Sequence, residues 1–470
     1  MGSSFGFGLN INTTGLGLNQ GLNVQQTVAA LVTAAEEPEQ TLKNQEQVYT
    51  SQQSVINNIN TLLGDLQTAV QALQDPLGGL AATAATSSNT SVLTGTTTTG
   101  AAVGAHTVTV TSLATTSAYD TNALASSTTT ISPGSFTLKV GSGTPVVINV
   151  SAANNNDTLN SLAAYINAQG DGVTASVITD VNGARLGLVS GTSGAPGDLT
   201  VSSNSTSLVF NKTVTGANSS INVDGVPLNT SSNTVSGAIP GVTLNLVGTS
   251  ATPVTLTVGA NSNQVSTTIN NFVSAYNAVI QAVNTQFTYT QGASSQPPLF
   301  SDSSLQMVQQ TLYTDVNYTI GGSSAYTTLA SMGVTLQQDG TLQVDNGTLN
   351  SAINANSAAV QNFFQQSTGA NGFAINFGND LTNLTNVTSG PLYLDLQGVN
   401  QNQQDLQNQI NQFQANVNQE ATLWLQEYAQ VNSLLQTLPL ELQQLNSQLG
   451  SLGGSSASSS SQSSSAPSGL

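Results

Sequence analysis

The chain has 470 residues, and 38% of them are hydrophobic, which is enough for about two to four domains with cores of their own. Only 6% are charged, and 4 Lys and Arg stand against 22 Asp and Glu, a formal net charge of −18. Nucleic acids and anionic membrane surfaces bind clustered basic residues, so four scattered cations exclude both classes of partner.

The chain has no cysteine, which excludes disulfides, thiolate nucleophiles and zinc sites of the cysteine type. Together with its many Ser, Thr, Asn and Gly residues, this composition is typical of exported extracellular proteins. The first residues form neither a basic n-region nor an apolar run, so we expect no cleaved secretory signal. No stretch approaches about 18 apolar residues, so we expect no membrane insertion.

Helical periodicity begins after a Gly- and Asn-rich start, residues 1–21, that is too polar to fold alone. Apolar residues in 24–35 are spaced 4, 3 and 4 apart and share one helix face. Pro38 predicts a kink or a new helix start. Residues 48–73 alternate spacings of 4 and 3, the register of a coiled coil. A Thr/Ser/Ala-rich linker is expected to follow up to about residue 104.

The middle of the chain changes to the period of β-strands. Alternating apolar and polar residues in 106–114 and 135–150 predict half-buried strands. Residues 157–170 form one amphipathic helix, capped by Asn156 or Asp157 at its start and ended by Gly170. The Asn-Gly pair at 182–183 predicts a type I′ hairpin turn.

A second strand cluster is predicted between residues 221 and 259, with the Asp-Gly pair at 224–225 as a turn. The helical period then returns. We expect helices at 265–287, 303–313 and 348–364, with a hairpin at 333–345 before the last of them.

The longest apolar seam runs from Leu406 to Leu449, with Pro439 predicted to kink it. The seam at 431–449 is expected to pack against the helices at 24–35 and 48–73, and against copies of itself. For 48–73 and 265–287, a role as the intramolecular core of a helical bundle is at least as favoured. The residues that we predict to make subunit contacts are Val24, Val28, Leu31, Val431, Leu434, Leu438, Leu442, Leu445 and Leu449.

Helices at both ends and β-modules between them predict an α+β, multidomain fold: a helical coiled-coil stalk made by both termini, with inserted β-rich head domains. The four expected domains are terminal helices with disordered ends (1–47 and 425–470), a mainly helical stalk domain (48–104 and 262–424), a β-rich head domain (105–132 and 213–261) and an inserted β-rich module (133–212).

The sequence contains no recognisable catalytic constellation. His106 is the only histidine and opens a strand, and no G-x-S-x-G elbow accompanies it to build a Ser-His-Asp triad. The acidic residues are scattered, and no phosphate-binding Gly-rich loop is present. A calcium site of loop carbonyls with one or two Asp stays open. We therefore predict no enzyme, with no catalytic, cofactor-binding or metal-binding residues and no cofactor.

Several stretches, taken in order, resemble the flagellar filament cap protein family, also called flagellar hook-associated protein 2. They include "GLNVQQTVAALVTAAEEPEQTLKNQEQ", "NTVSGAIPGVTLNLVG", "INNFVSAYNAVIQAVN" and "LASMGVTLQQDGTLQVDNGTLNSAINANSAAVQNFF". "GVTASVITDVNGARLGLVSGTSG" resembles the module that recurs in flagellins and hook-associated proteins. The resemblance covers about residues 20–450.

The resemblance implies a cap at the distal tip of the extracellular flagellum that promotes the folding and polymerisation of exported flagellin and prevents its loss. It implies a homo-oligomeric ring of about five subunits. The implied partners are flagellin, hook–filament junction proteins and an export chaperone at the C-terminal helix. Export would use the flagellar type III apparatus without a cleaved signal. In some members the head also contacts host surfaces.

The chain departs from the family in its near-absence of Lys and Arg, and Gln and Asn stand where Glu and Lys normally select coiled-coil partners. This departure leaves the oligomer number and the chaperone contacts open. Two alternatives remain: another flagellar axial protein, such as a filament-junction protein or a flagellin, and a secreted β-rich adhesin.

Overall fold

The computed structural model describes residues 24–292, 295–321, 324–366 and 372–453. The predictions made for residues 1–21 and for the serine-rich tail lie outside this part of the chain. Two compact units are formed: residues 1–58, 286–304 and 387–470 make the first, and residues 59–285 and 305–386 make the second.

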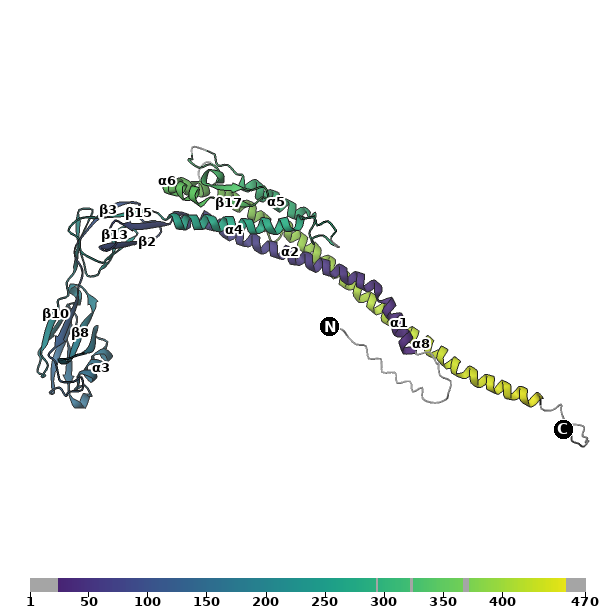
Figure 1. The fold of residues 1–470 in the computed structure, drawn as a ribbon, viewed down its shortest axis with the longest axis horizontal. Helices are drawn as coiled ribbons and strands as arrows, with labels where there is room; N and C mark the ends of the chain where they lie inside the picture. Colours follow the sequence, from purple (N-terminus) through teal and green to yellow (C-terminus); the bar gives the residue numbers. More distant parts are fainter. Residues whose placement is uncertain (1–23, 293–294, 322–323, 367–371, 454–470) are drawn as a thin grey trace, which may run out of the picture. The chain divides into compact units, whose positions relative to one another are not determined.

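The first unit consists mainly of helices from the two ends of the chain. They are α1 (Val24–Ala35), the first half of α2 (Glu37–Gln74) and α8 (Pro391–Gly453), and α1 lies along α8 (Figure 1). Pro38 is the second residue of α2, where a missing backbone N–H costs no intrahelical bond, so the predicted helix start is confirmed. α8 continues through Pro439, so this proline does not end the helix.

The second unit contains a helical part with an aromatic core. Its helices are α4 (Ser262–Phe287), α5 (Ser303–Val316), α6 (Asn346–Gln365) and α7 (Phe373–Leu384), and its hairpin is β16 (Val334–Leu336) with β17 (Leu342–Val344). The three predicted helices and the hairpin are confirmed, whereas α7 was not predicted. Its core includes six fully buried aromatic rings: Phe272, Tyr276, Phe363, Phe364, Phe373 and Phe377.

Two antiparallel sheets form between α2 and α4 in the sequence. One has the order β1-β15-β3-β11-β12 and the other β13-β14-β2. Their strands are β1 (Thr83–Ser87), β2 (Leu93–Thr97), β3 (Gly104–Ser112), β11 (Ser219–Val223), β12 (Val226–Thr230), β13 (Thr234–Ile239), β14 (Val242–Leu246) and β15 (Val254–Ala260). Asp224 and Gly225 both have positive φ, 50° and 86°, which confirms their turn.

The predicted linker up to residue 104 is wrong, because it contains β1 and β2. These strands are built from Thr, Ala, Ser and Gly with little apolar alternation, so their pattern is weak in the sequence. They form because β15 pairs with β1 and β14 pairs with β2 along their whole lengths. Tertiary pairing and the burial of Leu93 outweigh low strand propensity here.

A β-rich module with one helix occupies the sequence between β3 and β11. Its sheets have the orders β10-β4-β8-β7 and β6-β5-β9, and α3 (Leu159–Gln169) packs on β7 and β8. The strands are β4 (Thr116–Thr121), β5 (Gly134–Val140), β6 (Val146–Val150), β7 (Val173–Asp180), β8 (Gly183–Ser193), β9 (Leu199–Ser202) and β10 (Phe210–Val214).

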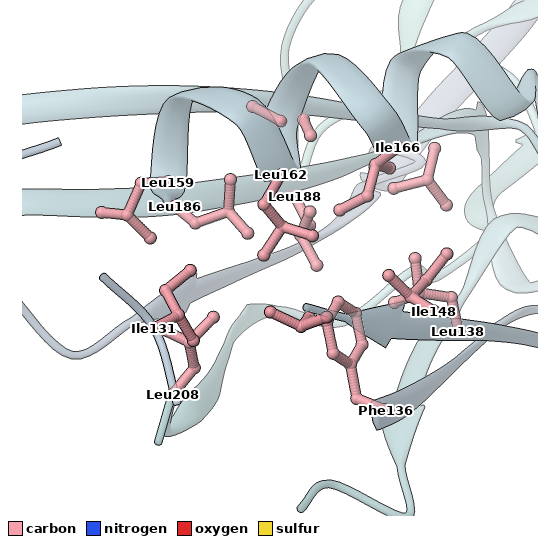
Figure 2. Close-up of a cluster of buried hydrophobic side chains, with 14 of the residues drawn as sticks. Ile131, Phe136, Leu138, Ile148, Leu159, Leu162, Ile166, Leu186, Leu188 and Leu208 are labelled. Atoms are coloured by element: carbon pink, nitrogen blue, oxygen red, sulfur yellow. The ribbon is translucent and has the colours of Figure 1, made fainter. Parts of the chain in front are cut away.

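The core of this module lies between α3 and the strands. Figure 2 shows Leu159, Leu162 and Ile166 of α3 above Phe136 and Ile148, all of them buried. This face of α3 is the one that the sequence predicted.

Two local predictions in the module need correction. The N-cap of α3 is Thr158, whose hydroxyl accepts from the Ser161 N–H, instead of Asn156 or Asp157, while Gly170 ends the helix at φ 70° as predicted. The β7–β8 hairpin is confirmed, but Asp180 pairs with Gly183, so the type I′ turn at 182–183 is wrong. Gly183, at φ 120°, follows the two turn residues instead of being one of them.

The predicted fold class is confirmed: the fold is α+β, with helices at both ends of the sequence and antiparallel sheets in its middle.

Candidate assembly surface on the terminal helices

α2 and α8 are joined by amide hydrogen bonds in one constant antiparallel register. From position 53 back to position 39 of α2, the bonded residue of α8 moves forward by the same number of positions, from 400 to 414. A constant register is what two straight, evenly packed antiparallel helices produce. The bonds are Gln53 Nε2 to Asn400 Oδ1 (2.8 Å), Gln403 Nε2 to Thr50 Oγ1 (3.3 Å) and Gln414 Nε2 to Glu39 Oε1 (2.7 Å).

α1 packs along α8, and two of the residues predicted to make subunit contacts are buried there. Val24 and Val28 are buried, and Leu31 is half-buried. On α8, Val417 and Ala421 are buried near this contact, while the buried Leu406 and Ile410 lie opposite α2 in the same register. Val24 and Val28 therefore attach α1 to α8 within one subunit.

Beyond α1, the apolar seam of α8 is exposed. The α2–α8 register places residue 431 and those after it past Val24, the first described residue of α1. The prediction that 431–449 packs against 24–35 and 48–73 is therefore wrong for the described part of the chain. The six predicted contact residues of α8 are 43–63% exposed: Val431, Leu434, Leu438, Leu442, Leu445 and Leu449. Their contact with other subunits stays a prediction.

The exposed seam is nearly free of charge. Between residues 431 and 453, Glu441 is the single Asp, Glu, Lys or Arg, although the whole chain carries −18. Two like-charged chains approach at lowest Coulomb cost where each presents few charges. The charge distribution thus favours contacts by this end of α8.

Glu39 is a buried carboxylate at the start of α2. It accepts hydrogen bonds from Lys43 Nζ and Gln414 Nε2, each of 2.7 Å. The bond from Lys43 lowers the pKa of Glu39 below its ordinary value, burial opposes this shift, and the bond from Gln414 adds to it. Glu39 is thus held in its charged form where it links the two helices. In the sequence, Pro38 indicates the start of α2, but no local pattern indicates that Glu39 contacts Gln414.

His106 has a structural role. Its Nδ1 lies 2.7 Å from Asp224 Oδ2, and Asp224 also accepts from the Thr107 N–H at 2.7 Å, so the pair ties the β11–β12 turn to β3. Within the described residues, no group of three or more His, Cys, Asp or Glu is placed to hold a metal ion. None of the helices that the structure describes is long and apolar enough to cross a membrane.

Family models match both ends and the middle of the chain. The model of the flagellar hook-associated protein 2 N-terminus matches residues 20–117, and that of its C-terminus matches residues 216–438. Between them, the flagellin hook IN motif matches residues 135–192, within the inserted module.

Individual relatives agree with these matches. The chain is 30% identical over 347 residues to the B-type flagellar hook-associated protein 2 of Pseudomonas aeruginosa, covering 66% of this chain and 73% of the relative. It is 27% identical to flagellar hook-associated protein 2 of Escherichia coli K12, covering 92% and 97%. The crystal structure of the D1-D2-D3 domains of the Escherichia coli flagellar cap protein FliD is 29% identical, with a TM-score of 0.55, and covers 74% of this chain and 99% of that one. The chain therefore belongs to the flagellar hook-associated protein 2 family, the family of the flagellar filament cap.

Proposed function

We propose that this chain caps the distal end of the bacterial flagellar filament, promotes the folding and polymerisation of exported flagellin there, and prevents its loss. The observation that carries this proposal is the family match at both ends of the chain. Filament-junction proteins and flagellins, as well as a β-rich adhesin, would account for the sheets but not for this pair of matches. The cap reading is therefore favoured over both alternatives.

We also propose that the chain acts as a homo-oligomer, a closed ring of about five subunits, in which the exposed seam of α8 makes subunit contacts. Six exposed apolar side chains, spaced three or four residues apart along one helix face, support this. The part of α8 beyond residue 431 would also bind the export chaperone before assembly. Flagellin and hook–filament junction proteins are the remaining proposed partners.

For the location, we propose the tip of the extracellular flagellum, reached through the flagellar type III export apparatus without a cleaved signal. The cysteine-free, Ser/Thr/Asn-rich composition supports export. The four-domain division likewise stays a proposal. The pairing of β4 with β8 and β10, and the bridge between Thr115 and Ala217, support module limits near 115 and 217 in place of 133 and 212.

The experiment that tests the cap function is a clean deletion of the gene. Flagellin is then measured in sheared filaments and in the medium, before and after complementation with the intact gene. We expect non-motile cells that lose monomeric flagellin to the medium, with recovery on complementation. Normal filaments in the deletion strain would contradict the proposal. Complementation with a Leu438→Gln, Leu442→Gln, Leu445→Gln variant then tests whether the seam is needed.

A further inference from the structure

All four Lys and Arg residues of the chain lie inside helices or strands. Lys43 is in α2, Lys139 in β5, Arg185 in β8 and Lys212 in β10. The rest of the chain, which includes every described loop and turn, contains neither residue type. Proteases of the trypsin class add one water across the peptide bond after Lys or Arg, leaving a new carboxylate and a new amine. The placement of these four residues therefore decides where such a protease can cut.

A peptide bond inside a helix or a paired strand is a poor substrate for such a protease. The protease binds several residues around the bond in an extended, unpaired form, so exposed loops are the usual points of cleavage. A bond in regular structure becomes available only when its element opens, and cleavage then follows the population of the open form. The contacts that hold each element therefore rank the four bonds.

The bonds after Arg185 and Lys139 lie in central strands of the module. β8 stands between β4 and β7, and β5 stands between β6 and β9. Leu186, which follows Arg185, is fully buried and donates its N–H to Thr121 Oγ1 at 2.9 Å. Lys139 is paired with Thr200 of β9. Each of these bonds becomes available only when its sheet comes apart.

The bond after Lys43 lies in the helix pair of the first unit. Lys43 Nζ is 2.7 Å from Glu39 Oε1, one turn earlier in α2. Glu39 also accepts the 2.7 Å hydrogen bond from Gln414 of α8. Cleavage here therefore requires the first turns of α2 to unwind and to leave α8.

The bond after Lys212 is the least protected of the four. β10 is at the edge of its sheet, next to β4, and the register of this pair shifts between Lys212 and Val214. Residues 211–214 are exposed. One contact holds the side chain, because Lys212 Nζ is 2.7 Å from Asp198 Oδ2. A trypsin-class protease binds the ammonium group in an acidic pocket of its own, so the ion pair with Asp198 must break first.

We propose that the folded chain is not a substrate of trypsin-class proteases, and that the bond between Lys212 and Thr213 is the first one that they cleave when the fold loosens. The proposal rests on the fold and on the positions of the basic residues. It is independent of the cap function.

The test is a time course of trypsin digestion of the full chain, with the cleaved bonds identified by mass spectrometry. Gln291→Lys is the positive control, because it places a basic residue at an exposed position between α4 and α5. We expect this variant to be cut at residue 291 at least about a hundredfold faster than the native wild type is cut at any bond. Native cleavage after Lys43, Lys139 or Arg185 at a rate close to that of the control would overturn the proposal.

Two further variants test the assignment of Lys212 in mild denaturant, where the wild type is cut slowly. Asp198→Asn removes the charge that holds the Lys212 ammonium group but keeps an oxygen for the Gly216 N–H, so cleavage after Lys212 should accelerate about fivefold. Lys212→Gln removes the cleavage site, so its first cut should come later than that of the wild type. An unchanged first cut in Lys212→Gln would overturn the assignment. So would wild-type cleavage after Lys139 or Arg185 as fast as after Lys212.

Discussion

The side-chain amide of Gln414 on α8 donates a 2.7 Å hydrogen bond to the buried carboxylate of Glu39 on α2. The two residues lie far apart in the sequence and meet where α2 begins after Pro38. Two other amide bonds in the same register lie further along the pair, at Thr50 and Gln53. The position of α8 along α2, and with it the length of α8 that extends beyond α1, is therefore fixed by polar contacts as well as by packing.

Removing the Gln414 amide should weaken this helix pair. Gln414→Ala deletes one of two hydrogen bonds to a buried carboxylate, so we expect the free energy of unfolding to fall by about 1–2 kcal/mol. Urea unfolding followed by helical circular dichroism measures it. Gln407→Ala is the control, because the exposed Gln407 amide donates to Asn411 on the same helix, and the change should stay within about 0.5 kcal/mol. Equal losses of unfolding free energy in both variants would show that the Gln414–Glu39 bond stabilises the fold no more than the exposed Gln407–Asn411 bond does.

Acid should remove the contribution of Glu39. Its pKa is below the ordinary value of 4.5 in the folded chain, so its stabilisation is present above that value and is lost as pH falls through the folded pKa. Glu39→Gln cannot titrate. The difference in melting temperature between wild type and Glu39→Gln should therefore be largest at neutral pH and shrink below about pH 4.5. A difference that stays constant from pH 7 to pH 3 would refute the assignment.

The exposed seam offers a matched pair of leucines. Leu442 and Leu440 are 60% and 59% exposed on the same helix, but only Leu442 belongs to the apolar stripe of 431–449. If the stripe makes subunit contacts, Leu442→Gln should weaken self-association by about tenfold, since burying one Leu contributes about 1.5 kcal/mol. Leu440→Gln should have little effect. Sedimentation velocity over a concentration series gives both constants, and equal weakening would argue against the stripe.

The side chain of Asn167 on α3 hydrogen-bonds the backbone at the edge of β7, where a neighbouring strand would otherwise pair. Its amide donates to the Ala175 carbonyl oxygen and its Oδ1 accepts from the Ala175 N–H, both at 2.8 Å. Asn167→Ala should destabilise the module by about 2 kcal/mol, because both backbone groups lose their partner. Hydrogen exchange in β7 of the full chain should rise accordingly. Asn160→Ala, which removes an exposed bond to Ser127 from the same helix, should leave β7 unchanged.

The long helices were predictable because periodic apolar spacing is a local signal. α4 and α8 show it over many turns. β1 and β2 were missed because small polar residues form strands there only through β15 and β14. α7 was missed because its apolar residues are separated by Gly and Asn, and its burial depends on the aromatic rings of α4 and α6.

The contact surface was predictable in part. The apolar stripe of 431–449 is visible in the sequence, but its exposure depends on where α1 begins along α8. The pair Glu39–Gln414 joins segments far apart in the sequence, so no local pattern reveals it.

The most direct test of the cap assignment is the position of the protein on the flagellum. An epitope inserted between Val181 and Asn182 would be accessible, because Val181 is 100% exposed at the β7–β8 turn. Immunogold electron microscopy of motile, complemented cells should then show label confined to the distal end of each filament. Label along the filament, or at the junction of hook and filament, would contradict the cap and identify another axial protein.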